Sequence, residues 1–223
     1  NYITAATLFN EIERLYPFSQ LAKRAIIMSA YASFEAGDYP AARTSARRYL
    51  DLYPADEDAA YAQYLIAQSY YDNIVDVGRD QETTQNALVE LNNVVQRYPE
   101  SPYARDAQLK IDLTRDHLAG KEMSVGRYYL KRGHYTAAIS RFRTVIDDYG
   151  TTSQVPEALH RLVEAYLALG LDAQAEAAAV VLGENFPGSE WYTDSYAALT
   201  GIEVVEKEDD GGTLSSLYRQ VIL

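Results

Sequence analysis

Apolar residues recur along this chain in a pattern typical of amphipathic helices. Five segments place apolar or small side chains at positions 0, +4 and +7, and each segment meets a proline or glycine at +12. Residues with this spacing lie on one face of an α-helix, and the proline or glycine ends the helix. The five origins are Ala5, Ala42, Ala87, Ala138 and Ala175. The five stops are Pro17, Pro54, Pro99, Gly150 and Pro187.

An aromatic residue stands directly before each stop, so the segments are copies of one unit. These residues are Tyr16, Tyr53, Tyr98, Tyr149 and Phe186. Successive origins are separated by 37, 45, 51 and 37 residues, which indicates a unit of about 37 residues with two insertions. A unit of this length holds a pair of helices, and the small residue at each origin lets a neighbouring helix approach closely.

Turn-forming residues are expected to separate these helices. Gly37, Gly133 and Gly170 each stand five residues before an origin, where glycine permits the left-handed backbone that ends many helices. Shortly after the stops come side chains suited to cap the next helix at its N-terminus. These candidate caps are Ser19, Asp56, Ser101, Ser153 and Ser189.

The unit has the spacing of the tetratricopeptide repeat, whose length is about 34 residues. We therefore expect an all-α, right-handed solenoid of about five repeats over residues 1–205, with only the second helix of the first repeat present. The third repeat carries an insertion, Asn73 to Thr84, which is either a longer hairpin or part of a binding face. The residues before the fourth repeat, Pro102 to Ala119, are predicted to be helical and to continue as one rod to Arg132.

Two further segments follow the repeats. Residues 206–212 are acidic and end in glycines, which is typical of a linker. Residues 213–223 predict a short amphipathic helix that is too short to be stable alone in water. Its apolar face consists of Leu214, Leu217, Tyr218, Val221 and Ile222. We expect this face to dock on a partner assembly; docking on the chain's own last repeat and a frayed tail are the alternatives.

Composition excludes several functions. The chain has 20 Lys and Arg against 32 Asp and Glu, a formal net charge of −12, which argues against binding to nucleic acids or adsorption to an anionic membrane. It contains no cysteine, so disulfides and cysteine-ligated metals are absent. The three histidines, His117, His134 and His160, show no metal-binding spacing, and no motif of a nucleophilic or phosphate-binding enzyme occurs. We expect no catalytic site, metal or cofactor.

Tyrosine is abundant, with 20 copies. The repeat register points a set of side chains on the first helices towards the concave face, where an aromatic groove would suit an extended or β-forming peptide. The set consists of Arg24, Ile27, Tyr31, Tyr61, Tyr64 and Tyr71. The alternative, that these rings belong to the core between helices, stays open at this stage.

Several stretches go beyond what a repeat requires. They include Leu15 to Ser19, Asp76 to Gln81, Arg97 to Ala104 and, above all, Leu118 to Tyr129. With these stretches the chain, from about Phe9 to Tyr192, resembles the BamD family of tetratricopeptide lipoproteins.

The resemblance implies a scaffold at the periplasmic face of the bacterial outer membrane. Membrane attachment would be through a lipidated N-terminal cysteine, which this chain lacks. The implied partners are BamA, through its POTRA domains, the other Bam subunits, and unfolded outer-membrane proteins. Arg141 corresponds to a family arginine that pairs with an acid of a POTRA domain; a solvated charge or a pair within the repeat is the alternative.

The repeats alone are compatible with a second function. Another periplasmic or cytosolic tetratricopeptide adaptor, binding a peptide of an unrelated partner, would show the same periodicity. Only the insertion and the stretch Glu122 to Tyr129 separate the two interpretations.

Overall fold

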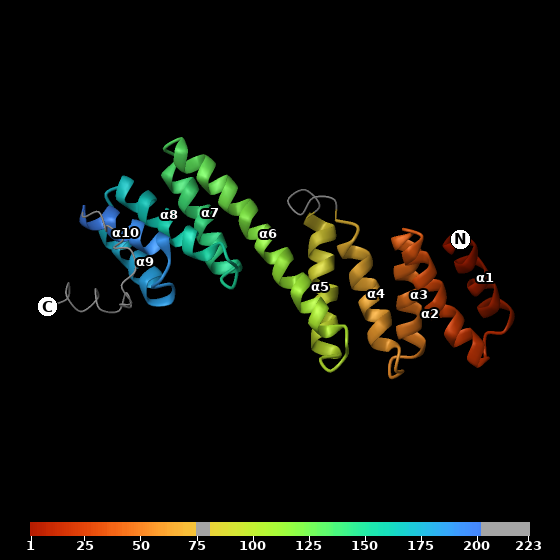
Figure 1. The fold of residues 1–223 in the computed structure, drawn as a ribbon. Helices are drawn as coiled ribbons and strands as arrows, with labels where there is room; N and C mark the ends of the chain where they lie inside the picture. Colours follow the sequence, from red (N-terminus) through yellow and green to blue (C-terminus); the bar gives the residue numbers. More distant parts are fainter. Residues whose placement is uncertain (75–80, 202–223) are drawn as a thin grey trace. The chain divides into compact units, whose positions relative to one another are not determined.

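The computed structural model describes residues 1–74 and 81–201, and all regular elements in those ranges are α-helices (Figure 1). The all-α fold class is therefore confirmed. The helices are α1 (Tyr2–Leu15), α2 (Gln20–Glu35), α3 (Tyr39–Leu52), α4 (Ala59–Tyr71), α5 (Gln81–Arg97), α6 (Ala104–Lys131), α7 (Tyr135–Asp148), α8 (Val155–Ala168), α9 (Asp172–Asn185) and α10 (Glu190–Thr200).

The aromatic residue before each stop ends a helix through the same local structure. Tyr16, Tyr53 and Phe186 share φ values between −133° and −135° and ψ values of 54° to 55°. At all five stops the backbone N–H three residues later donates to the aromatic residue's carbonyl, with N···O distances of 3.0 to 3.2 Å. The predicted helix ends are thus confirmed as one closed turn used five times.

The glycine turns within repeats are equally regular. Gly37, Gly133 and Gly170 have φ of 76°, 74° and 70°. The N–H that follows each glycine donates to a carbonyl five residues back, as Asp38 does to Ser33 at 2.9 Å. This is the Schellman motif, which satisfies carbonyls at a helix end and turns the chain back into an antiparallel neighbour.

Two of the five predicted caps are confirmed, and three are wrong. Ser19 and Ser189 accept backbone N–H groups at the starts of α2 and α10. Asp56, Ser101 and Ser153 lie two or three residues before their helices, because α4, α6 and α8 begin at Ala59, Ala104 and Val155. Two of these three side chains bind distant partners, which compete with the local role.

Asp56 forms hydrogen bonds with side chains of two preceding helices. Its carboxylate accepts hydrogen bonds from Lys23 on α2 and from the hydroxyl of Tyr49 on α3. The hydrogen bond from Lys23, followed by that from Tyr49, lowers the pKa of Asp56 to about 2. Ser153 similarly donates to Asp116 Oδ1 on α6 at 2.6 Å. These residues tie neighbouring repeats together instead of capping one helix.

The irregular regions agree with the sequence in part. The rod before the fourth repeat is confirmed, because α6 runs for 28 residues. The insertion was predicted to reach Thr84, but α5 already begins at Gln81, and Thr84 is a fully buried residue of that helix. The middle of the insertion, residues 75–80, lies outside the described residues, as does the C-terminal segment from residue 202.

The apolar stripe of the second helices forms the core. Four of the five origins, Ala42, Ala87, Ala138 and Ala175, are fully buried. The corresponding +7 side chains, Tyr49, Val94, Val145 and Leu182, are also fully buried. In α1 the stripe residues Ala5, Phe9 and Ile12 remain partly exposed; α1 packs mainly against α2, and its Glu13 pairs with Arg48 of α3 at 2.6 Å.

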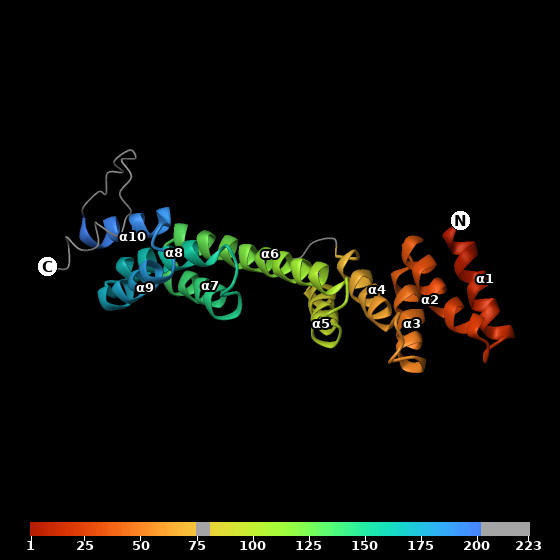
Figure 2. The ribbon, with the colours of Figure 1, turned by 60° about the horizontal axis from the view of Figure 1, so that its bottom comes forward.

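The chain forms two compact units, Asn1–Thr114 and Arg115–Leu223, and the boundary falls inside α6. In the first unit, consecutive helices from α1 to α5 pack side by side (Figure 2). In the second unit, α7, α8 and α9 do the same, and α10 covers α8 and α9. Each unit has its own apolar clusters.

Packing within the second unit depends on one glycine. A Cβ atom added to Gly126 of α6 would lie 2.4 Å from Cε1 of Phe142 on α7, far inside van der Waals contact. Phe142 is fully buried. Glycine is therefore required at position 126 for α6 and α7 to approach this closely.

A buried histidine attaches the last helix. His160 of α8 is 5% exposed, and its Nδ1 lies 2.8 Å from Oγ of Ser195 on α10. Ser195 in turn donates to the carbonyl of Trp191 at 2.8 Å, and the rings of His160 and Trp191 are 5.3 Å apart. Burial lowers the pKa of His160, although Glu164, with an oxygen 3.7 Å from Nε2, raises it.

We expect Gly126→Ala to destabilise the protein by about 1–3 kcal/mol, because overpacking of a fixed core outweighs the better helix propensity of alanine. Gly120→Ala is the matched control: it lies in the same helix with no atom within 4 Å of its added Cβ, and we expect it to stabilise by about 0.5–1 kcal/mol. Urea denaturation followed by circular dichroism measures both. Equal effects of the two substitutions would contradict the steric argument.

We expect the stability contributed by His160 to fall as the pH drops below its ordinary pKa of about 6.5. Because the lowered pKa makes the folded state bind the proton less tightly than the unfolded state, acidification favours unfolding in this window. Melting temperatures measured from pH 7 to 5 should decline less for His160→Gln than for the natural protein. Parallel curves would show that His160 does not contribute to the pH dependence.

Candidate partner-binding surfaces

Three of the predicted groove residues lie in one row of half-buried aromatic rings in the first unit. We call Tyr31, Tyr61, Tyr64 and Tyr103 the tyrosine row. Tyr103, which precedes α6, stacks on Tyr64 with ring centroids 5.0 Å apart and lies 5.4 Å from Tyr61. Tyr31 packs against the same apolar cluster as Tyr61. The row thus joins α2, α4 and the start of α6.

The tyrosine row is fixed by polar contacts at its α6 end. The Tyr64 hydroxyl donates to Asp106, and Lys110 binds both that hydroxyl and the carboxylate. Burial and the hydrogen bond to Asp106 raise the pKa of Tyr64. Burial, followed by the neighbouring Tyr103 and Tyr31, also raises the pKa of Tyr61. Tyr61 and Tyr64 are therefore neutral, and the contacts of Tyr64 order its ring before any ligand binds.

The other predicted groove residues are Arg24, Ile27 and Tyr71. Ile27 is 7% exposed and packs in the core of α2, α3 and α4, so it contributes to packing. Tyr71 is half-buried and packs against the apolar cluster of Leu91 and Val94, which Tyr64 and Tyr103 also contact. Arg24 is exposed on α2. Sequence reasoning missed Tyr103; its position four residues after a stop, at the start of a first helix, was the available signal.

A second surface was not predicted. Leu15, Tyr16, Phe18 and Leu21 surround the turn between α1 and α2, and we call this set the Phe18 turn. Phe18 is 102% exposed, whereas the corresponding residues of the other four turns, Ala55, Glu100, Thr151 and Gly188, are small or polar. Tyr16 is also exposed, although the aromatic residue at each of the other stops is half-buried. Comparison of the five turns in the sequence could have revealed Phe18.

Arg141 lies on α7 and faces α6. Its Nη1 donates to Glu122 Oε2 at 2.9 Å, with the Arg141 side chain 45% exposed and that of Glu122 15% exposed. Within the described residues no acceptor binds its Nη2 or Nε. Arg141 is thus paired within the chain through Nη1, and the other edge of its guanidinium group stays available for a partner.

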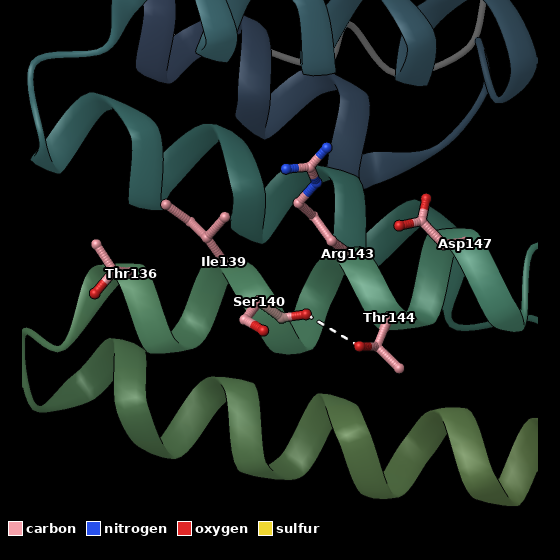
Figure 3. A pocket seen from close by; sticks show the side chains of 6 residues that line it. All are labelled: Thr136, Ile139, Ser140, Arg143, Thr144 and Asp147. Carbon is pink, nitrogen blue, oxygen red and sulfur yellow. Dashed lines mark hydrogen bonds between the residues drawn. The ribbon is translucent and has the colours of Figure 1, made fainter.

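The outer side of α7 has a different character. An open depression of about 450 Å³ is lined by α7 alone (Figure 3). Its lining consists of Thr136, Ile139, Ser140, Arg143, Thr144 and Asp147. The Thr144 hydroxyl donates to the Ser140 carbonyl at 3.1 Å within the helix. The depression does not include Arg141 and is a polar, solvated helix surface.

The remaining predictions concern the C-terminal segment, metal binding and membrane-spanning helices. Leu214, Leu217, Tyr218, Val221 and Ile222 lie outside the described residues. In residues 1–74 and 81–201, no three acidic or histidine side chains gather where they could hold a metal. Over the same ranges no helix combines the length and apolar character needed to cross a bilayer.

These features define a helical repeat protein of the tetratricopeptide type, with an aromatic surface in one unit and an available arginine in the other. The sequence model of the YfiO family, described as an outer membrane lipoprotein, matches residues 1–181. The chain belongs to this family.

Several relatives carry the description "outer membrane protein assembly factor BamD". That of Caulobacter vibrioides is 51% identical over 89% of this chain and 65% of its own length, so the chain spans slightly less than two thirds of that relative. That of Rickettsia prowazekii is 45% identical, covering 87% of this chain and 78% of the relative. That of Neisseria meningitidis is 34% identical, covering 88% and 77%.

Among solved structures, a thermophilic TPR protein of Thermus thermophilus aligns over 90% of this chain and 91% of its own, with 18% identity and a TM-score of 0.38. The fold assignment rests on the helix pairs and turns of this chain itself.

Proposed function

We propose that this protein is a non-enzymatic scaffold in the assembly of outer-membrane β-barrel proteins. The observation that carries the proposal is membership of the family, with 51% identity to an assembly factor over 89% of the chain. The surfaces support it, since they offer aromatic rings and a charged side chain suited to binding. An unrelated tetratricopeptide adaptor, the alternative left open by the repeats, would not account for this similarity.

The proposed location is the periplasmic face of the outer membrane. The family's description as an outer membrane lipoprotein supports association with that membrane. A lipid anchor on a cysteine outside this chain is the attachment that the resemblance implies.

The proposed partner of the second unit is BamA, through an acidic residue of a POTRA domain. An arginine fork binds a carboxylate well because its planar N–H groups match both oxygens. Arg141 has a free edge for such a pair. The amphipathic C-terminal segment, with Leu214, Leu217, Tyr218, Val221 and Ile222, is proposed to add an apolar contact to BamA or to another Bam subunit.

We expect Arg141→Ala to weaken binding of the isolated BamA POTRA domains by about 2–5 kcal/mol, because an acid of the partner would lose its cation. Arg143→Ala is the matched control, since Arg143 lies two residues away on the outer side of α7. Isothermal titration calorimetry measures both affinities, and circular dichroism checks the fold. Equal affinities for both variants would remove Arg141 from the interface.

The same titration tests the C-terminal segment. If the segment docks on the partner, deletion of residues 213–223 lowers the affinity and leaves the melting temperature unchanged. A lowered melting temperature with intact affinity would make the segment an intramolecular cap.

The proposed ligands of the first unit are unfolded outer-membrane proteins. Such chains carry alternating apolar and aromatic residues, which suit the exposed Phe18 turn and the rings of the tyrosine row. Arg24 and Tyr71 belong to the predicted groove and stay in this proposal. Ile27, being buried, supports the fold beneath it.

We expect Phe18→Ser to weaken binding of a urea-unfolded β-barrel protein by about 1.5–3 kcal/mol, the free energy of burying one such side chain. Leu109→Ser is the control, because Leu109 is an exposed apolar residue of the same unit outside both surfaces. Fluorescence anisotropy of the labelled substrate reports the affinity. A loss of equal size in both variants would indicate non-specific apolar binding.

A further inference from the structure

We infer that Glu122 is a positioning residue, which holds the Arg141 guanidinium in the orientation that presents its free edge to an acidic partner. The inference rests on the proposed contact between Arg141 and a partner carboxylate. It concerns a residue on a different helix, and it follows from the geometry of the ion pair.

The backbone beneath the pair is fixed by close packing. Gly126 lies one helical turn after Glu122 on α6, and Phe142 directly follows Arg141 on α7. The ring of Phe142 occupies the space that a side chain at position 126 would fill. Because this contact sets how α6 and α7 lie against each other, it also sets which α6 side chain reaches Arg141.

The hydrogen bond between Arg141 and Glu122 uses only one edge of the guanidinium group. Glu122 takes a single N–H, from Nη1, at 2.9 Å. The described residues place no acceptor on Nη2 or Nε, which together form the other edge of the fork. Arg127 of the same unit is more fully bound, since its Nη1 contacts both oxygens of Glu157, at 2.9 and 2.8 Å, and its Nη2 donates to Ser124 Oγ at 3.4 Å. Arg141 therefore keeps a two-donor edge for a second carboxylate.

Glu122, which would position the arginine, is less exposed than Arg141, which would bind the partner. The Glu122 side chain is 15% exposed, whereas that of Arg141 is 45% exposed. A free arginine side chain has large rotamer entropy, and ordering such a side chain at an interface opposes binding. Glu122 orders the Arg141 side chain before the partner binds, so less conformational entropy is lost on binding.

The competing interpretation predicts the opposite change in affinity for the partner when Glu122 is removed. If Glu122 only neutralised Arg141, it would compete with the partner's acid, and its removal would strengthen binding. Glutamine separates the two interpretations, because its side-chain carbonyl can still accept the bond from Nη1 while its charge is gone.

The experiment is a titration of the full chain with the isolated BamA POTRA domains by calorimetry. We expect Glu122→Ala to weaken binding about two- to tenfold, and Glu122→Gln to stay within about twofold of the natural protein. Glu176→Ala, which removes an exposed acid from α9, controls for the change of net charge and should have no effect. Melting temperatures are compared for all variants, to exclude a loss of fold.

Two outcomes overturn the inference. Stronger binding of either Glu122 variant would make Glu122 a competitor, and an unchanged affinity of Glu122→Ala would make it a bystander. The proposed contact is checked separately. If Arg141→Ala has no effect, the contact itself fails; if Arg141→Ala loses binding and Glu122→Ala does not, only the positioning role fails. In the double variant, the effect of Glu122→Ala should vanish, because there is no arginine left to position.

Discussion

The fold depends on how closely the paired helices can approach. At the origin of each second helix an alanine, and at one first helix Gly126, leaves room for a neighbour's side chain or backbone. Larger residues there would separate the helices and expose the stripe at +4 and +7. Interiors are packed at crystal-like density, so a displacement at one crossing is transmitted to the next helix. The position of every surface side chain follows from these crossings.

Polar contacts supplement this packing where helices of different repeats meet. Asp56, in the loop before α4, binds Lys23 of α2 and Tyr49 of α3, and Asp116 joins α6 to the start of α8 through Ser153. His160 and Ser195 do the same for α8 and α10. A buried polar group without a partner is destabilising, so such pairs favour one arrangement of neighbouring helices over slipped alternatives. This specificity is what a scaffold needs, because its surfaces are assembled from several helices.

The two units offer different chemistry to their surroundings. The first presents the packed rings of the tyrosine row and the exposed Phe18 turn, which suit apolar and aromatic chains. The second presents a cation with one free edge, in a chain of net charge −12. An aromatic surface tolerates many sequences, whereas an arginine fork selects a carboxylate in a defined position. The first is therefore suited to varied ligands and the second to a single folded partner.

The sequence by itself determined the helices, the points where the second helices end and the repeat register, because these depend on residues a few positions apart. The +12 stops, the glycines at 37, 133 and 170, and the long α6 were all predictable on that basis. Which side chains meet was decided by the tertiary structure. Asp56 binds Lys23 and Tyr49 instead of capping a helix. Tyr103 packs in the tyrosine row. Glu122 accepts a hydrogen bond from one edge of Arg141, which lies 19 residues away along the chain. Local rules describe one helix and its turn, but these contacts arise only when the packing of several helices brings distant residues within a few ångströms.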